Sequence, residues 1–103
     1  MYGISRGNDP NGPKLFFSLW DVKGYWQSYE GSPAIRIYRN TERKDGGYFI
    51  EVSYDRNTVY HLPIKQYWGD LYYFDLFGFV GLAYDPDTDT LYLSLYGEYH
   101  RMQ

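Results

Sequence analysis

The stretch "GYFIEVSYDRNTVYHLPIK", residues 47–65, decides the fold of this chain. Its first part, residues 47–54, alternates between two sets of side chains, one of them aromatic and β-branched. Such alternation is typical of a β-strand with one buried face. Residues 55–57 are Asp-Arg-Asn, which favour a turn, and a second alternating run follows over 58–66. The stretch therefore predicts two antiparallel strands joined by a short loop.

The same pattern continues on both sides of this hairpin. The runs are rich in aromatic residues, β-branched residues or Leu, and short segments with Gly, Asp, Asn or Pro separate them. The predicted strands are GYWQSY (24–29), AIRIYR (34–39), GYFIEVSY (47–54), TVYHLPIKQ (58–66), LYYFDLF (71–77), FVGLAY (79–84), TLYLSLY (90–96) and EYHRM (98–102). Because the links leave no room for helical crossovers, neighbouring strands must be antiparallel. We expect an all-β, antiparallel meander of about eight strands that closes into a small barrel.

The length of 103 residues suits a single domain. Residues 1–14 hold three Gly and two Pro and predict an irregular arm, so we place the barrel domain at 15–103. In "LFFSLWD" (15–21), Ser18 followed by Asp21 three residues later resembles a capping box and predicts a short helical turn. Pro63 cannot donate a hydrogen bond in a sheet, which suggests an edge strand or a bulge.

Composition narrows the classes of function. The chain has 14 Tyr, 6 Phe, 3 Trp and no Cys, which argues against disorder and excludes disulfides and zinc fingers built on Cys. Residues 1–54 carry seven basic and six acidic side chains, whereas residues 55–103 carry three and seven. An acidic second half disfavours a groove that follows phosphates, so we do not expect a nucleic-acid partner. A five-stranded oligonucleotide-binding barrel stays an alternative fold.

Two features that the sequence lacks bear on the location of the protein in the cell. No stretch approaches the roughly 18 consecutive apolar residues of a membrane helix, so we expect no membrane span. The first residues hold no apolar run of the kind found in signal peptides. The chain would be cytoplasmic if residue 1 is the native start, and exported if a leader has been removed.

Gly24-Tyr25-Trp26, on the first predicted strand and after a short helical turn, resembles the Gly-x-Trp signature of lipocalins and their calycin relatives. The resemblance implies that Trp26 packs at one end of the barrel against an arginine near the end of the last strand, here Arg101. It implies that "LFFSLWD" plugs that end and that an apolar ligand could lie in the lumen. The sequence is also similar to small Bacteroides-type proteins with a "GxW…FDLFG…LxLSxYGxYxR" pattern and no assigned activity.

Alternation assigns most strand residues to one of two faces. If Trp26 faces inward, the same face holds large side chains that would fill a small barrel: Tyr48, Ile50, Val52, Tyr60, Leu62, Tyr72, Phe74, Leu91, Leu93 and Leu95. The opposite face carries the residues that we predict to form a binding surface: Tyr38, Phe49, His61, Tyr73, Tyr92 and Tyr96. Aromatic rings with a polar tip are common in protein interfaces.

Catalytic and metal-binding patterns are weak. His61 or His100 could meet Glu51 or Asp75, but no nucleophile signature accompanies them. The acidic run over 85–89 lacks the Gly and Glu of a calcium loop and predicts a hairpin turn instead. We expect no metal and no cofactor.

From these features we expect a non-enzymatic binding module that uses an aromatic outer face to bind a protein partner or a second copy of itself. A carrier of a small apolar ligand in the lumen is the alternative, and a small hydrolase-type enzyme comes last.

Overall fold

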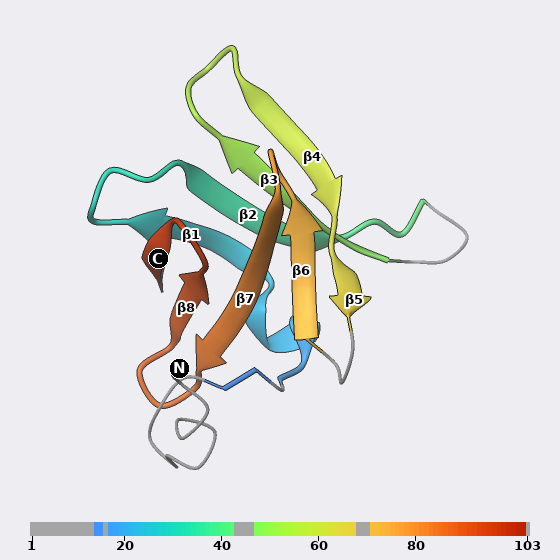
Figure 1. The fold of residues 1–103 in the computed structure, drawn as a ribbon, viewed down its shortest axis with the longest axis vertical. Helices are drawn as coiled ribbons and strands as arrows, with labels where there is room; N and C mark the ends of the chain where they lie inside the picture. Colours follow the sequence, from blue (N-terminus) through green and yellow to red (C-terminus); the bar gives the residue numbers. More distant parts are fainter. Residues whose placement is uncertain (1–13, 16, 43–46, 68–70, 103) are drawn as a thin grey trace.

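The computed structural model describes residues 14, 15, 17–42, 47–67 and 71–102, and Figure 1 shows the chain as a ribbon. One short 3₁₀ helix, η2 (Leu19–Val22), precedes nine strands. The strands are β1 (Gly24–Ser28), β2 (Ala34–Arg39), β3 (Tyr48–Ser53), β4 (Val59–Pro63), β5 (Lys65–Tyr67), β6 (Leu71–Asp75), β7 (Phe79–Asp85), β8 (Thr90–Leu93) and β9 (Gly97–Arg101). The described residues thus form an all-β structure with one helical turn, as predicted.

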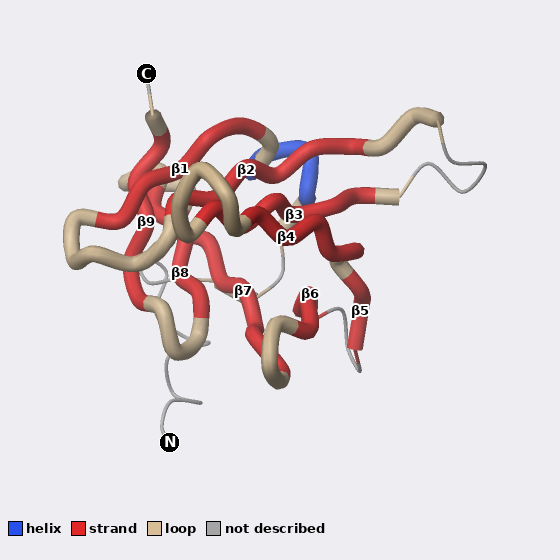
Figure 2. Tube along the Cα trace, turned by 90° about the horizontal axis from the view of Figure 1, so that it is seen from above, coloured by secondary structure: helices blue, strands red, loops and turns tan. Residues whose placement is uncertain are grey.

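The strands follow the order β4-β3-β2-β1-β9-β8-β7-β6-β5, and every ladder is antiparallel. All neighbours are consecutive in the chain except β1 and β9, which pair through Trp26 and Arg101. This pairing joins two meanders into one nearly closed barrel, whose strands surround a common interior in Figure 2. The predicted meander is confirmed, and the five-stranded alternative is wrong.

The predicted strand over 58–66 is divided at Ile64. Its first part, β4, pairs with β3, and its second part, β5, pairs with β6. The amide of Ile64 still donates to the Tyr48 carbonyl at 2.9 Å, so the change of partner takes place within one residue. β4 and β5 are also the two ends of the strand order, which agrees with the edge position predicted from Pro63. Division of this segment is the reason that nine strands are present instead of eight.

Large side chains fill the interior. The fully buried side chains of greatest volume are Trp26, Tyr99, Phe74, Ile37, Ile50, Leu82, Leu91, Val22, Val52 and Val80. Of the residues predicted to face inward, Ile50, Val52, Phe74, Leu91 and Leu93 are buried, and four others are partly buried against the core: Tyr48, Tyr60, Leu62 and Tyr72. Leu95 was predicted incorrectly, because residues 94–96 form a turn and its side chain is 85% exposed.

One end of the barrel is closed by η2. The Ser18 hydroxyl accepts a hydrogen bond from the Trp20 amide at 3.2 Å, which caps the helical turn as the sequence predicts. Leu19 and Val22 are buried beneath the turn. The indole Nε1 of Trp26 donates to the Val22 carbonyl at 2.9 Å and so fixes the turn to the first strand.

Arg101 completes this end from the last strand. Its guanidinium lies 4.4 Å from the centre of the Trp26 ring, and its Nη1 and Nη2 donate to the carbonyls of Lys23 and Asp21 at 2.6 and 2.7 Å. Gly24 has a φ of +127°, and a Cβ at this position would lie 3.2 Å from Arg101 Nη1. The contact between Trp26 and Arg101 that the resemblance implies is thus present in the structure, and Gly24 gives Arg101 the room to form it. A barrel alone does not identify a lipocalin.

The predicted arm, residues 1–14, lies outside the described residues except for Lys14. Lys14 forms an antiparallel bridge with Tyr84 of β7, with both backbone hydrogen bonds at 2.8 and 2.9 Å. Within the described part of the chain, no helix is long and apolar enough to cross a membrane.

Candidate functional site

Three of the six predicted binding residues meet on the outer face of β2, β3 and β4. Tyr38 and Phe49 are register partners whose ring centres lie 6.0 Å apart, and the Tyr38 hydroxyl lies 3.2 Å from His61 Nδ1. The Arg36 guanidinium lies 4.3 Å from the Tyr38 ring centre and 5.7 Å from that of Tyr25. Because other side chains already lie against its ring, Tyr38 belongs to a stacked surface and is not an open platform for a flat ligand.

Glu51 is the acidic member of this outer face. Its Oε1 lies 3.6 Å from Arg36 Nη1 and 3.9 Å from His61 Nδ1. The three residues are aligned across β2, β3 and β4 by the register Arg36↔Glu51↔His61. A histidine and a carboxylate therefore do meet, but they do so on the outside of a sheet.

The other residues considered for catalysis form different contacts. His100 stacks on Tyr29 at 4.7 Å, and Asp75 forms an ion pair with Lys65 at 3.5 Å.

The remaining three binding residues do not join the first group. Tyr73 lies on β6 and stacks on Phe79 at 4.7 Å, whereas Tyr92 lies on β8. Tyr96 lies in the β8–β9 turn and packs partly against the core, because the strand predicted over 90–96 ends at Leu93. The predicted surface is therefore divided into three regions.

Tyr96 forms a contact of its own at the end of the barrel opposite η2. Its hydroxyl lies 3.2 Å from that of Tyr54. This hydrogen bond, followed by burial, raises the pKa of Tyr54 to about 12. Ser32 donates to the Tyr96 carbonyl at 2.7 Å and holds the β8–β9 turn against the β1–β2 loop.

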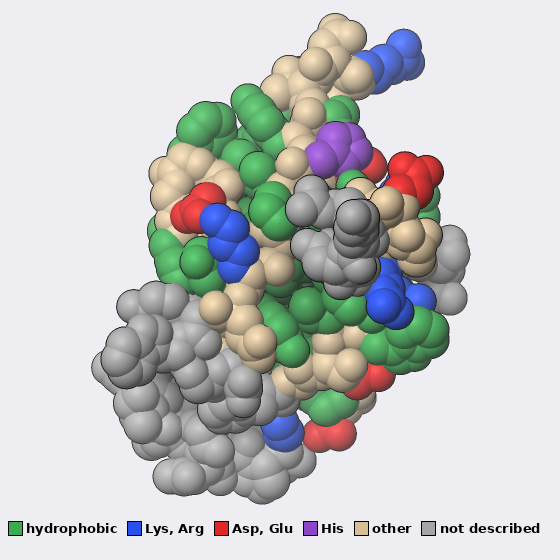
Figure 3. All heavy atoms as spheres, turned by 90° about the vertical axis from the view of Figure 1, so that its right-hand side faces the viewer, with side chains coloured by type: hydrophobic (Ala, Val, Ile, Leu, Met, Phe, Trp, Pro, Cys, Tyr) green, Lys and Arg blue, Asp and Glu red, His purple; other side chains and the backbone are tan. Residues whose placement is uncertain are grey.

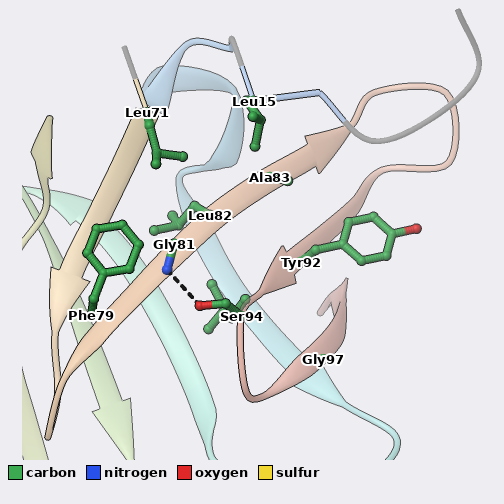
Figure 4. Close-up of a pocket in the computed structure, with 10 residues that line it drawn as sticks. Leu15, Leu71, Phe79, Gly81, Leu82, Ala83, Tyr92, Ser94 and Gly97 are labelled. Carbon is green, nitrogen blue, oxygen red and sulfur yellow. Dashed lines mark hydrogen bonds between the residues drawn. The ribbon is translucent and has the colours of Figure 1, made fainter. Parts of the chain in front are cut away.

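An open apolar groove lies outside the barrel over β7, and we call it the β7 groove. Its volume is about 390 Å³, and its floor includes Gly81 and Ala83. Phe79 and Tyr92 rise on opposite sides of this floor in Figure 4, with Leu15 and Leu71 at one end. At the other end, the Ser94 hydroxyl accepts a hydrogen bond from the Gly81 amide at 2.8 Å. The groove can receive an apolar side chain from outside the molecule.

The alternation of β7 explains the groove. Val80, Leu82 and Tyr84 point into the barrel and are buried, so the residues between them face outward. At two of these outward positions the side chain is absent or a single methyl group, namely at Gly81 and Ala83. A glycine within a strand often marks a tight bend. Gly81 does not have a positive φ, so such a bend does not explain why a glycine stands at this position.

Sequence reasoning did not find this groove. The available signal was two small residues at alternate positions of a strand whose neighbours carry large rings.

Hydrophobic side chains are also exposed on the face of the molecule that carries β4 and β5 (Figure 3). Seen from the side of β4 and β5, they cover wide areas between small groups of charged side chains (Figure 3). Two walls of the β7 groove, Leu15 and Phe79, are about half exposed. Exposed apolar area that gathers around a hollow is typical of interaction sites.

The acidic turn between β7 and β8 has a structural role. Asp85 Oδ1 accepts a hydrogen bond from the Asp87 amide at 3.0 Å, as expected for a turn of this composition. Asp89 accepts two hydrogen bonds from Arg101, at 2.7 and 2.9 Å, and a third from the Tyr84 hydroxyl at 2.7 Å. Among the described residues, no group of three or more acidic or histidine side chains could hold a metal ion.

The fold and the groove define an all-β barrel with an apolar hollow on its outer face. Comparison with protein-family models, with curated proteins and with solved structures gave no match.

Proposed function

We propose that this protein is a non-enzymatic binding module whose outer face holds a protein partner or a second copy of the chain. The observation that carries the proposal is the β7 groove, an open apolar hollow bordered by Phe79 and Tyr92. A hollow of this kind accepts an anchoring side chain, and such anchors supply most of the free energy in protein interfaces. Two of the six predicted residues, Tyr73 and Tyr92, lie beside it or in its wall.

The filled interior supports an outer site. Trp26, Phe74 and Tyr99 are fully buried inside the barrel and occupy volume that a ligand in the lumen would need. The carrier hypothesis stays a second candidate because the lipocalin resemblance motivates it. Native mass spectrometry of freshly purified protein decides between the two, because a carrier would retain an apolar molecule of defined mass.

A variant that fills the groove tests whether the groove is the binding site. Ala83→Leu places a larger side chain on the floor, and Ala34→Leu makes the same change on β2, at an exposed position away from the groove. Both variants are compared with Tyr92→Ala and Tyr73→Ala by size exclusion with light scattering and by affinity capture.

We expect Ala83→Leu and Tyr92→Ala to lose self-association or the captured partner, and Ala34→Leu to keep it. A strict monomer whose captured partners are the same in all four variants would contradict the proposal.

A further inference from the structure

The segment that forms most of the β7 groove, from β6 to His100, carries acidic side chains and no basic ones. Arg101, the last residue of β9, is paired with Asp89, and Lys14 precedes the groove residue Leu15. Residues 71–100 include five carboxylates and neither Lys nor Arg. Within the described residues, Asp75 is paired with Lys65 and Asp89 with Arg101, at 3.5 and 2.7 Å. Asp85, Asp87 and Glu98 form no such ion pair there. Of these, Glu98 and Asp85 lie near the groove, and neither forms an ion pair with another described residue.

Two of these carboxylates act on the wall of the groove. Glu98 of β9 is the register partner of Tyr92, so both side chains stand on the same face of the sheet. Asp85 lies two residues beyond Ala83, the partner of Tyr92 on the other side. Burial, followed by the charges of Glu98 and Asp85, raises the pKa of the Tyr92 hydroxyl. The Tyr92 wall of the groove therefore stands near two carboxylates, those of Glu98 and Asp85.

We propose that the β7 groove binds a partner segment in which large apolar side chains alternate with Lys or Arg. This inference rests on the proposed function. An apolar side chain would displace water from Gly81 and Ala83, and a neighbouring cation would lie over the Tyr92 ring and beside Glu98. An acidic segment would be repelled by the same carboxylates.

The shape of the groove favours an extended peptide. It crosses β7 obliquely, from Leu15 and Leu71 at one end to Ser94 and Gly97 at the other, as Figure 4 shows. In an extended segment, alternate side chains point to the same side, so apolar residues can enter the groove while the residues between them remain at its charged border.

Three synthetic peptides of equal length test the inference, with repeats of Leu-Lys, Leu-Glu and Ser-Lys. Their binding to the full chain is measured by fluorescence anisotropy at low and at high salt. We expect the Leu-Lys peptide to bind most tightly, with an affinity that falls as salt increases, because salt screens exposed charges. Glu98→Gln should weaken its binding about two- to fivefold, and Glu42→Gln, in the β2–β3 turn, should leave it unchanged.

The outcomes separate this inference from the proposed function. If the Leu-Lys and Leu-Glu peptides bind equally and Ala83→Leu abolishes both, the groove is a binding site but the charge preference is wrong. If Ser-Lys binds as tightly as Leu-Lys, attraction is purely electrostatic and the inference is also wrong. If no peptide binds, the inference fails. The proposed function fails only if Ala83→Leu and Ala34→Leu also behave alike in the assays of self-association and capture. Circular dichroism confirms that each variant is folded before it is compared.

Discussion

Trp26 and Trp20 lie close together in the chain and occupy opposite environments. The Trp26 ring is fully buried between η2, Arg101 and Tyr84, whereas Trp20 is 61% exposed, with Lys23 Nζ 3.4 Å from its ring centre. Comparison of the two residues separates the contribution of a buried indole to stability from that of an exposed indole in the same protein. The closed end depends on the buried ring, because η2 and the last strand both contact it.

We therefore predict that Trp26→Ala lowers the free energy of unfolding by about 3–5 kcal/mol, because it leaves a cavity that the surrounding residues cannot fill. Trp20→Ala, the matched control, should change it by about 0.5 kcal/mol or less. Urea unfolding followed by circular dichroism measures both values. A loss of less than about 1 kcal/mol for Trp26→Ala would show that the closed end does not depend on its ring.

The structural residues could be predicted from the sequence because their signals are local or chemically specific. Gly24 and Trp26 stand beside a recognisable turn, and the resemblance to lipocalins implied that Arg101, near the end of the last strand, is the partner of Trp26. For the predicted binding residues, the sequence indicated only which face of the sheet each side chain lies on, and not which of them are neighbours. Whether Tyr38 and Tyr73 are neighbours depends on which strands lie between them, and that order follows from the β1–β9 pairing.

At the scale of elements, two turns carry large apolar residues in the left-handed region. Phe77 in the β6–β7 turn has φ +58° and is 84% exposed, and Leu95 in the β8–β9 turn has φ +76°. A glycine lies one or two residues later in each case, at Gly78 and at Gly97, the first residue of β9. The sequence therefore suggests turns at the glycines, and this is why the strand predicted over 90–96 extended too far.

Leu95→Gly should raise the free energy of unfolding by about 0.5–1 kcal/mol. The change removes about 1–2 kcal/mol of backbone strain and little packing, and it loses part of this gain through the greater freedom of glycine in the unfolded chain. Leu95→Val at the same position is the control and should be destabilising, since β-branched side chains tolerate this region least. Thermal unfolding of the two variants compares them directly. A glycine variant less stable than the wild type would mean that the Leu95 side chain is stabilising where it stands.

At the scale of the whole molecule, one cluster joins distant parts of the chain. Arg101 donates to two backbone carbonyls at η2, those of Asp21 and Lys23, and to both carboxylate oxygens of Asp89. The Tyr84 hydroxyl donates to the same carboxylate. The hydrogen bonds from Arg101 are the largest cause of the lowered pKa of Asp89. The closed end is therefore linked to pH through one carboxyl group.

The sign of this linkage follows from the lowered pKa. A carboxyl group whose pKa is lower in the folded protein stabilises it above the ordinary value of 3.8, and the contribution is lost as pH falls through the folded-state pKa. We predict that the difference in unfolding free energy between the wild type and Asp89→Asn is constant near neutral pH and shrinks below about pH 4. Urea unfolding over that range measures it, with Asp87→Asn as the control from the same turn. A difference that stays constant down to about pH 2.5 would exclude Asp89 as the linked group.

The pairing of β1 with β9 also has a consequence for the path of folding. Every other ladder joins neighbours in the chain, and such hairpins form within microseconds because little entropy is lost in closing a short loop. The contact between Arg101 and Lys23 spans 78 positions, so forming it closes a long loop and costs chain entropy. Few other interactions can offset this loss of entropy before both meanders have formed. Barrel closure is thus the step with the greatest entropic barrier. Until it occurs, β1 and β9 present unpaired edges to other chains, which is the stage at which aggregation competes with folding.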